Sequence, residues 1–98
     1  MAMFTLHIEH AITDYPTWRS AFERFADARR TAGVRLARVA QPVDDDRYIT
    51  IDLDFDTRDQ AEAFRQFLRT KVWASPASAP ALTGAPRTSV LALVDAAS

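Results

Sequence analysis

Two stretches of the sequence, residues 3–11 and 47–55, alternate between apolar and polar residues one by one. A period of two places successive side chains on opposite faces of a β-strand, so both stretches predict strands with one apolar face. In the second stretch the apolar positions are Ile49, Ile51, Leu53 and Phe55. In the first they are Phe4, Leu6 and Ile8, and His10 shares their parity. A chain with two such strands needs a second layer that covers one face of the sheet.

The first helix is predicted directly after the first strand. Asp14 is a good N-cap, and Pro16 falls in the first turn, where its missing N–H costs nothing. The aromatic positions at helical spacing are Trp18, Phe22 and Phe25. This spacing predicts one amphipathic helix of about five turns. Gly33 is a natural residue to end it.

The second helix is predicted after residue 56. Thr57 and Gln60 have the spacing of a capping box at its start. The apolar stripe that follows consists of Ala61, Phe64, Phe67 and Leu68. We expect this helix to end near Trp73.

Two further strands are predicted at residues 34–41 and 87–94, with an irregular connection over residues 75–86, which are rich in Ala, Ser and Pro. The order is then βαββαβ, and right-handed crossovers leave few ways to close it. We expect one α+β domain over residues 1–98, with a ferredoxin-like fold. Its four-stranded antiparallel sheet has strand order 4-1-3-2, and both helices lie on one face.

The opposite face of this sheet has no cover in a monomer. Its central strands carry polar residues, namely Thr5, His7, Glu9, Tyr48, Thr50 and Asp52, and we expect the outer strands to add Val39 and Val90. Solvent can cover such a mixed face. A second copy can cover it equally well, and we expect a sheet-to-sheet homodimer.

Composition excludes several classes of function. A net charge of −1 gives no electrostatic footprint for nucleic acid or an anionic membrane. The absence of cysteine excludes disulfides and thiolate chemistry, and it fits a reducing compartment. Because the first residues show no signal-peptide pattern and no apolar run approaches the roughly 20 residues that span a bilayer, we expect a cytoplasmic protein.

A longer pattern carries a family resemblance. Its positions are His10, Asp14-Tyr15, Trp18-Arg19, Phe22, then Arg29 or Arg30, Ala32-Gly33-Val34, Asp52-Leu53-Asp54-Phe55-Asp56, Ala61, Phe64, Gly84 and Pro86. This pattern resembles the dimeric α/β-barrel superfamily, which includes antibiotic-biosynthesis monooxygenase-like proteins. The resemblance implies a barrel formed by two facing sheets and a ligand pocket in each subunit between helices and sheet.

Members of that superfamily include cofactor-independent oxygenases, haem-degrading enzymes, isomerases and proteins of no known activity, so the fold implies little about function. A haem-degrading member needs an axial histidine on the second helix or the loop after it, and neither segment contains one. We expect no cofactor.

His10 is the candidate catalytic residue, because it lies at the end of a strand beside the start of a helix, where it could act as a general base. The alternative is a structural histidine bonded to the backbone or to Asp14. The candidate substrate-binding residues are Tyr15, Trp18, Phe22, Arg30 and Phe64. The aromatic residues among them could line a pocket for a flat substrate or simply form the core, and Arg29 and Arg30 could bind an anionic group or only complement the helix dipole.

His7, Glu9, Asp52 and Asp54 share the open face of the sheet. Their spacing matches no specific metal motif, and we interpret them as a polar network at a dimer interface, with no metal site. Two functions remain. One is a non-catalytic dimer that binds a small ligand or none. The other is a cofactor-independent monooxygenase or related enzyme acting on an aromatic or polyketide-like molecule.

Overall fold

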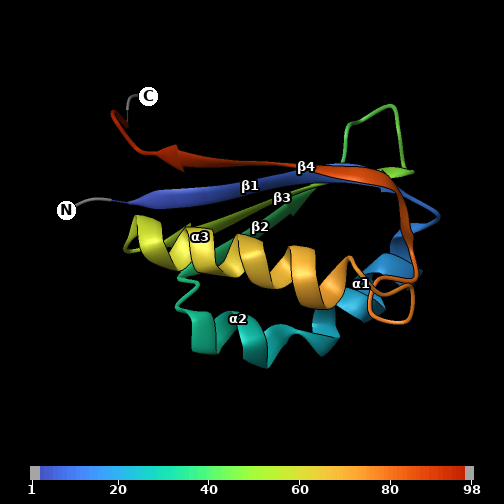
Figure 1. Cartoon of the computed structure of the whole chain (residues 1–98). Coiled ribbons are helices and arrows are strands. Elements are labelled where there is room, and N and C mark those ends of the chain that lie inside the picture. Colours follow the sequence, from blue (N-terminus) through green and yellow to red (C-terminus); the bar gives the residue numbers. More distant parts are fainter. Residues whose placement is uncertain (1–2, 97–98) are drawn as a thin grey trace.

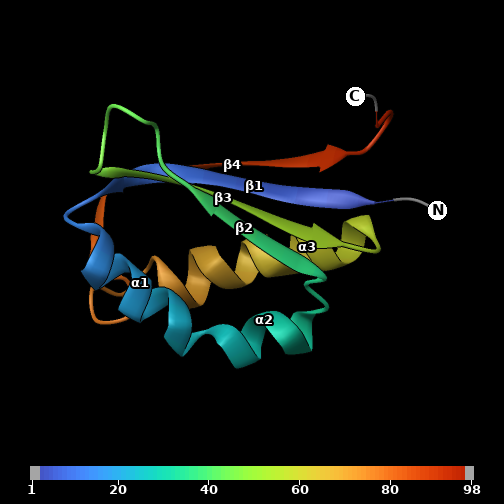
Figure 2. The same ribbon diagram turned by 180° about the vertical axis from the view of Figure 1, so that it is seen from behind.

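An antiparallel sheet forms one layer of the molecule, and the helices form a second layer on one face of it (Figure 1). The computed structural model describes residues 3–96. The elements in chain order are β1 (Phe4–Ile12), α1 (Tyr15–Arg24), α2 (Ala26–Ala32), β2 (Leu36–Ala40), β3 (Tyr48–Phe55), α3 (Arg58–Phe67), the π-helical turn η1 (Leu68–Val72) and β4 (Leu82–Ala92). Figure 2 shows from behind that the other face of the sheet carries no helix.

The sheet has the strand order β2-β3-β1-β4, which confirms the predicted order. In the centre, Leu6 pairs with Leu53 and Ile8 with Ile51, and all four side chains are buried under the helices. The two alternating stretches therefore form the central strand pair, with the predicted faces. His10 pairs with Ile49 and belongs to this covered face.

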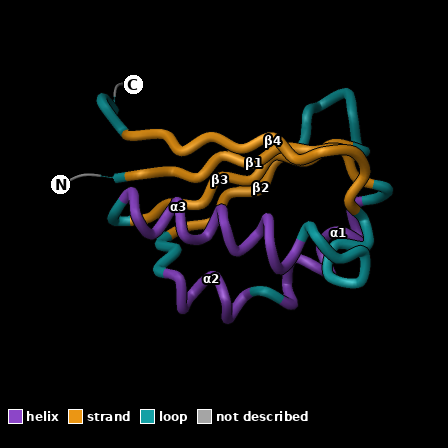
Figure 3. The backbone as a smooth tube through the Cα atoms, viewed as in Figure 1, coloured by secondary structure: helices purple, strands orange, loops and turns teal. Residues whose placement is uncertain are grey.

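The predicted first helix is interrupted. Phe25, with φ −102° and ψ 16°, separates α1 from α2, and Figure 3 shows a break in the helix between them. In a continuous helix the carbonyl of Phe22 would accept the N–H of Ala26. Here it accepts the N–H of Phe25 (3.2 Å) and the Nη1 of Arg29 (2.7 Å). A side chain inserted into the backbone ladder is a known cause of helix kinks.

The predicted starts of both helices and the predicted helix end at Gly33 are confirmed. The Asp14 carboxylate accepts the N–H of Thr17 at 2.8 Å at the start of α1. Thr57 and Gln60 form both bonds of the capping box before α3. Gly33 has φ 93° at the end of α2, in the left-handed region that favours glycine.

β4 begins at Leu82, and not at residue 87 as predicted. Ala11 pairs with Thr83 whereas Glu9 pairs with Arg87, so the register shifts opposite His10. This irregularity accommodates residues 84–86, which include a glycine with φ 74° and a proline, and both are typical of bulges. The predicted irregular connection is thus shorter, and part of it belongs to the sheet.

Val39 and Val90 do not lie on the open face, and that prediction is wrong. Val39 pairs with Ile51 and Val90 with Leu6, so both lie on the covered face and pack against the core. In edge strands with apolar residues at both parities, the pairing with the neighbouring strand decides which face each residue occupies.

Candidate ligand-binding site

A cleft opens between the helices and the covered face of the sheet. Its free volume is about 80 Å³. This volume lies below the roughly 300 Å³ at which ligand sites usually begin. A flat molecule would therefore lie only partly inside the cleft.

The wall of the cleft is largely aromatic. Its aromatic side chains are Trp18, Phe22, Phe25, Phe64 and Trp73. Trp18 and Phe22 are stacked with their ring centroids 4.7 Å apart, and Trp18 and Phe64 are almost fully buried. Three of the predicted substrate-binding residues, Trp18, Phe22 and Phe64, thus lie together in this wall. The same side chains also form part of the core.

Tyr15 lies outside the wall. Its ring is 38% exposed and packs against Trp18, with centroids 5.9 Å apart. It is the first residue of α1, and its side chain covers the outer side of Trp18.

His10 lines the cleft and is only 5% exposed. Its Nδ1 donates a hydrogen bond to the Ala11 carbonyl at 2.9 Å, because a carbonyl can only accept. Burial lowers the pKa of His10, which favours the neutral imidazole. In that neutral form Nδ1 carries the proton and Nε2 carries a lone pair.

The Nε2 atom of His10 has no hydrogen-bond partner within residues 3–96. In the same part of the chain, every side-chain nitrogen or oxygen that is fully hidden from solvent has a hydrogen-bond partner. Because Nε2 has no partner, it is not fully hidden from solvent. The ring lines the cleft and packs edge-on against Trp73, with 6.3 Å between the ring centroids. The structure thus combines a backbone-held ring, one of the two predicted alternatives, with a free acceptor at the cleft.

Of the two arginines at the end of α2, Arg29 lies in the wall and Arg30 does not. Arg30 is exposed and pairs with Asp27, one turn earlier on the same helix. The Arg29 guanidinium stacks over the Phe22 ring, with its carbon 3.6 Å from the ring centroid. Sequence reasoning considered both arginines but selected Arg30, and the only signal for Arg29 is its distance of four and seven residues from Phe25 and Phe22.

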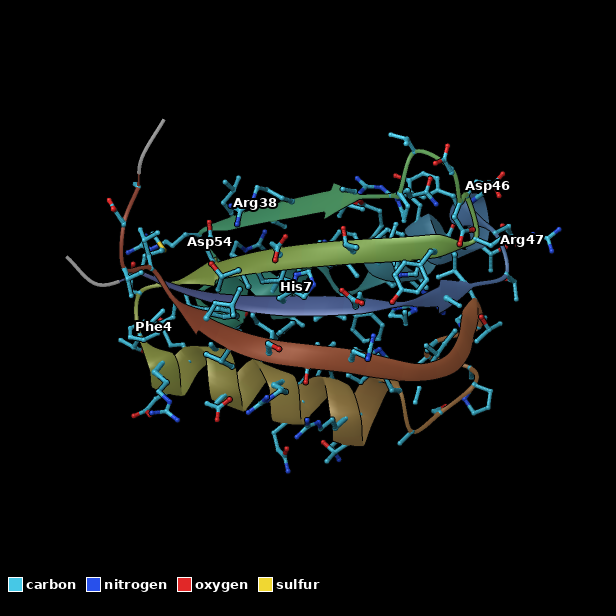
Figure 4. All side chains as sticks on the ribbon, turned by 90° about the horizontal axis from the view of Figure 1, so that it is seen from above. Phe4, His7, Arg38, Asp46, Arg47 and Asp54 are labelled. Atoms are coloured by element: carbon cyan, nitrogen blue, oxygen red, sulfur yellow. The ribbon has the colours of Figure 1, made fainter. Side chains whose placement is uncertain are left out.

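A polar network occupies the open face of the sheet (Figure 4). His7 Nδ1 lies 2.7 Å from Asp52 and its Nε2 lies 2.9 Å from Glu9. Hydrogen bonds raise the pKa of His7, the bond to Glu9 more than the bond to Asp52. Arg38 on β2 forms a bidentate ion pair with Asp54 on β3, with Nη1–Oδ2 at 2.5 Å and Nη2–Oδ1 at 3.0 Å.

Within residues 3–96, no group of three or more histidines and carboxylates is arranged to hold a metal ion. In that same range no helix has the length and apolar character that a membrane crossing requires.

No protein-family model matches the sequence, and no curated protein matches it either. Solved structures do match the fold. A dimeric ferredoxin-like protein from an uncultured marine organism has a TM-score of 0.69 at 13% identity, over 99% of this chain and 100% of that one. The chain therefore has the same ferredoxin-like fold as that protein.

Two further structures with this fold have names that describe an activity. A protein described as an antibiotic biosynthesis monooxygenase from Bordetella bronchiseptica has a TM-score of 0.73 at 12% identity, over 93% of this chain and 96% of that one. SnoaB, a cofactor-independent oxygenase from Streptomyces nogalater, has a TM-score of 0.64 at 15% identity, over 100% and 97% of the two chains. At such identities the likeness concerns the fold, so the chemistry of the cleft has to be argued from its own residues.

Proposed function

We propose that this protein binds a small, flat, largely apolar molecule in the cleft between helices and sheet. The observation that carries the proposal is His10, a neutral imidazole in an aromatic wall with an unbonded acceptor that is not fully hidden from solvent. The ligand should carry a hydroxyl group that donates to Nε2. A hydroxyl without a partner in such a wall loses its hydrogen bonds to water, so this single acceptor selects for molecules that place a donor there.

The affinity of matched probes tests this proposal. 4-Phenylphenol and 4-methoxybiphenyl have the same ring system, and only the phenol can donate a hydrogen bond. We expect calorimetry to give about tenfold tighter binding for the phenol, the equivalent of one hydrogen bond. The chain has two tryptophans, and since both Trp18 and Trp73 line the cleft, quenching of their fluorescence locates the probe.

Two variants complete this test. His10→Phe should abolish the preference for the phenol, because it removes the acceptor and keeps an aromatic ring. Tyr15→Phe is the matched control, since it removes a hydroxyl beside the wall but outside it, and it should keep the preference. Equal affinities of the two probes for the wild type would refute the role of His10. No saturable binding of either probe would refute the cleft as a ligand site.

An oxygenase is the second candidate, and the same Nε2 atom favours it. A neutral imidazole within reach of a phenol can act as a general base and generate the more easily oxidised phenolate. Dioxygen would be the oxidant, with one oxygen atom entering the product as a carbonyl and the other leaving as water. The fold shared with SnoaB supports this candidate by analogy.

Oxygen consumption separates the two candidates. If the protein is an oxygenase, the wild type should consume oxygen with a polycyclic phenol, and folded His10→Gln should not. If it only binds, neither protein should turn over, and His10→Gln should change the melting temperature and ligand affinity alone. We expect the second outcome.

We also propose that two copies pair through the open face of the sheet. This face carries two exposed leucines, Leu36 (53%) on β2 and Leu91 (50%) on β4. The same face carries the ion pairs of His7 with Glu9 and Asp52 and of Arg38 with Asp54. A dimeric protein with the same fold supports this proposal.

Sedimentation at micromolar concentration tests the pairing. We expect twice the 11.0 kDa mass of one chain. Leu36→Asp should shift the protein toward the monomer. Val43→Asp is the control, because Val43 is 99% exposed in the turn between β2 and β3. A monomer mass for the wild type would refute the dimer.

A further inference from the structure

We infer that the ligand of the cleft is an organic monoanion, an aromatic carboxylate or a group of the same charge, and that Arg29 binds its charged end. This inference rests on the proposed function, and it adds a charged end for Arg29 to the hydroxyl group that His10 Nε2 accepts on the same molecule. The sequence suggested anion binding by Arg29 or Arg30, and the inference assigns it to Arg29.

The first argument is the set of donors that Arg29 leaves free. A guanidinium has five N–H donors in a planar fork that matches a carboxylate. One of them is bound to the Phe22 carbonyl at 2.7 Å, and the ring of Phe22 supports the flat face of the group at 3.6 Å. The other nitrogens, Nε and Nη2, have no partner within residues 3–96, and they are not sealed. The Arg29 guanidinium is therefore held in one orientation, and several of its N–H donors remain without a protein partner.

The second argument is charge. Arg19, Arg30, Arg35, Arg38 and Arg65 each form an ion pair with a carboxylate. Four other arginines of the described residues form none, but they are exposed and lie outside the wall, namely Arg24, Arg47, Arg58 and Arg69. Arg29 forms no ion pair in the part of the chain that the structure describes. Glu23 attracts it electrostatically, but the Glu23 carboxylate pairs with Arg19 at 2.5 Å.

Burial adds to this imbalance. Desolvation lowers the pKa of Arg29, although the group stays charged at neutral pH. A charge that borders an apolar wall without a counterion is unfavourable, and an anion in the cleft would relieve it. Besides Arg29, the polar residues of the wall are His10 and Ser78, and a neutral His10 adds no charge. One positive charge in an aromatic wall suits a singly charged acid with an apolar body better than a phosphate dianion.

The tests use a pair of probes and a pair of variants. 2-Naphthoate and 2-naphthamide have nearly the same shape, and only the first is an anion at neutral pH. Arg29→Gln removes the charge in the wall. Arg30→Gln removes the same charge from the next residue, which lies outside the wall and pairs with Asp27. Calorimetry gives the affinities, and quenching of Trp18 and Trp73 confirms that each probe occupies the cleft.

We expect the wild type and Arg30→Gln to bind naphthoate at least tenfold more tightly than naphthamide, as a charge-assisted hydrogen bond allows. Arg29→Gln should lose this preference and keep its affinity for naphthamide within about twofold. Equal binding of the two probes by the wild type, or an equal loss in both variants, would overturn the inference and leave the cleft as a neutral site. If neither probe quenches the tryptophans, the proposed function fails as well.

Arg29 also holds the break between α1 and α2, so Arg29→Gln can unfold. In that case Arg29→Lys replaces Arg29→Gln in the binding measurements, because it keeps the charge and loses the planar fork of N–H donors. We expect it to retain part of the preference for naphthoate. A full loss of preference in folded Arg29→Lys supports recognition by the fork, whereas an undiminished preference would show that the geometry of Arg29 plays no part and would overturn the assigned contact.

Discussion

Phe22→Ala is the substitution that best tests the description of the cleft. Phe22 is half-buried, with the Trp18 ring stacked on it and the Arg29 guanidinium over its face. Deletion of a fully buried phenylalanine costs about 3–5 kcal/mol, from the loss of apolar burial and the cavity left behind. At Phe22 the cavity part is reduced, because the space joins a hollow that already exists. The loss of ring stacking with Trp18 increases the cost by about 0.5–1.5 kcal/mol.

We therefore expect Phe22→Ala to lower the free energy of unfolding by about 2–3 kcal/mol, less than the value for a phenylalanine sealed in the core. Phe64 is 4% exposed and provides the comparison, since Phe64→Ala should cost the full amount of about 3–5 kcal/mol. With a urea slope of about 1–2 kcal/mol per molar, the midpoint for Phe22→Ala should fall by roughly 1–3 M.

Circular dichroism is the appropriate signal for these urea titrations, because Trp18 fluorescence depends directly on Phe22. A cost below about 1 kcal/mol would show that Phe22 contributes little to the core and that its ring belongs to the mouth of the hollow. A cost equal to that of Phe64→Ala would show that the wall is sealed around Phe22. Either result would contradict a half-buried Phe22 in an open wall.

Two further predictions concern other parts of the fold. Gly33→Ala should lower the free energy of unfolding by about 1–2 kcal/mol, because Gly33 has φ 93° and a Cβ there would lie 2.7 Å from the side-chain nitrogen of Gln60. In urea titrations the cost of Gly33→Ala combined with Gln60→Ala should be clearly less than the sum of the two single costs. Full additivity would contradict the contact. His7→Gln should remove a pH-dependent part of the stability, because the pKa of His7 is raised in the folded protein. The bonds of His7 to Glu9 and Asp52 stabilise the fold fully below pH 6.5, and this effect is lost as the pH rises through the raised pKa. The difference in stability between wild type and variant should therefore grow as the pH falls from 8 to 6, and a difference independent of pH would contradict this prediction.

The central strands and the helix starts could be predicted from the sequence because their signals are local. Alternation over residues 47–55 assigns the faces of β3 without knowledge of any partner. The same parity places His10 on the covered face. The Thr57 capping box involves residues three positions apart and forms whatever lies around it.

The edge strands and the cleft depended on tertiary contacts. Val39 and Val90 lie in segments with apolar residues at both parities, so pairing with Ile51 and Leu6 decides their face. The choice between Arg29 and Arg30 followed from one contact, that of the Arg29 guanidinium with the Phe22 carbonyl, which ends α1 and turns Arg29 into the wall.

The periodicity of the sequence thus determined which segments bury an apolar face, since that depends on spacing along a single element. Which charged and polar groups border the cleft was decided only by the tertiary structure. A side chain at an element end can reach solvent or the interior at similar local energy, and the contacts made by neighbouring elements select between the two.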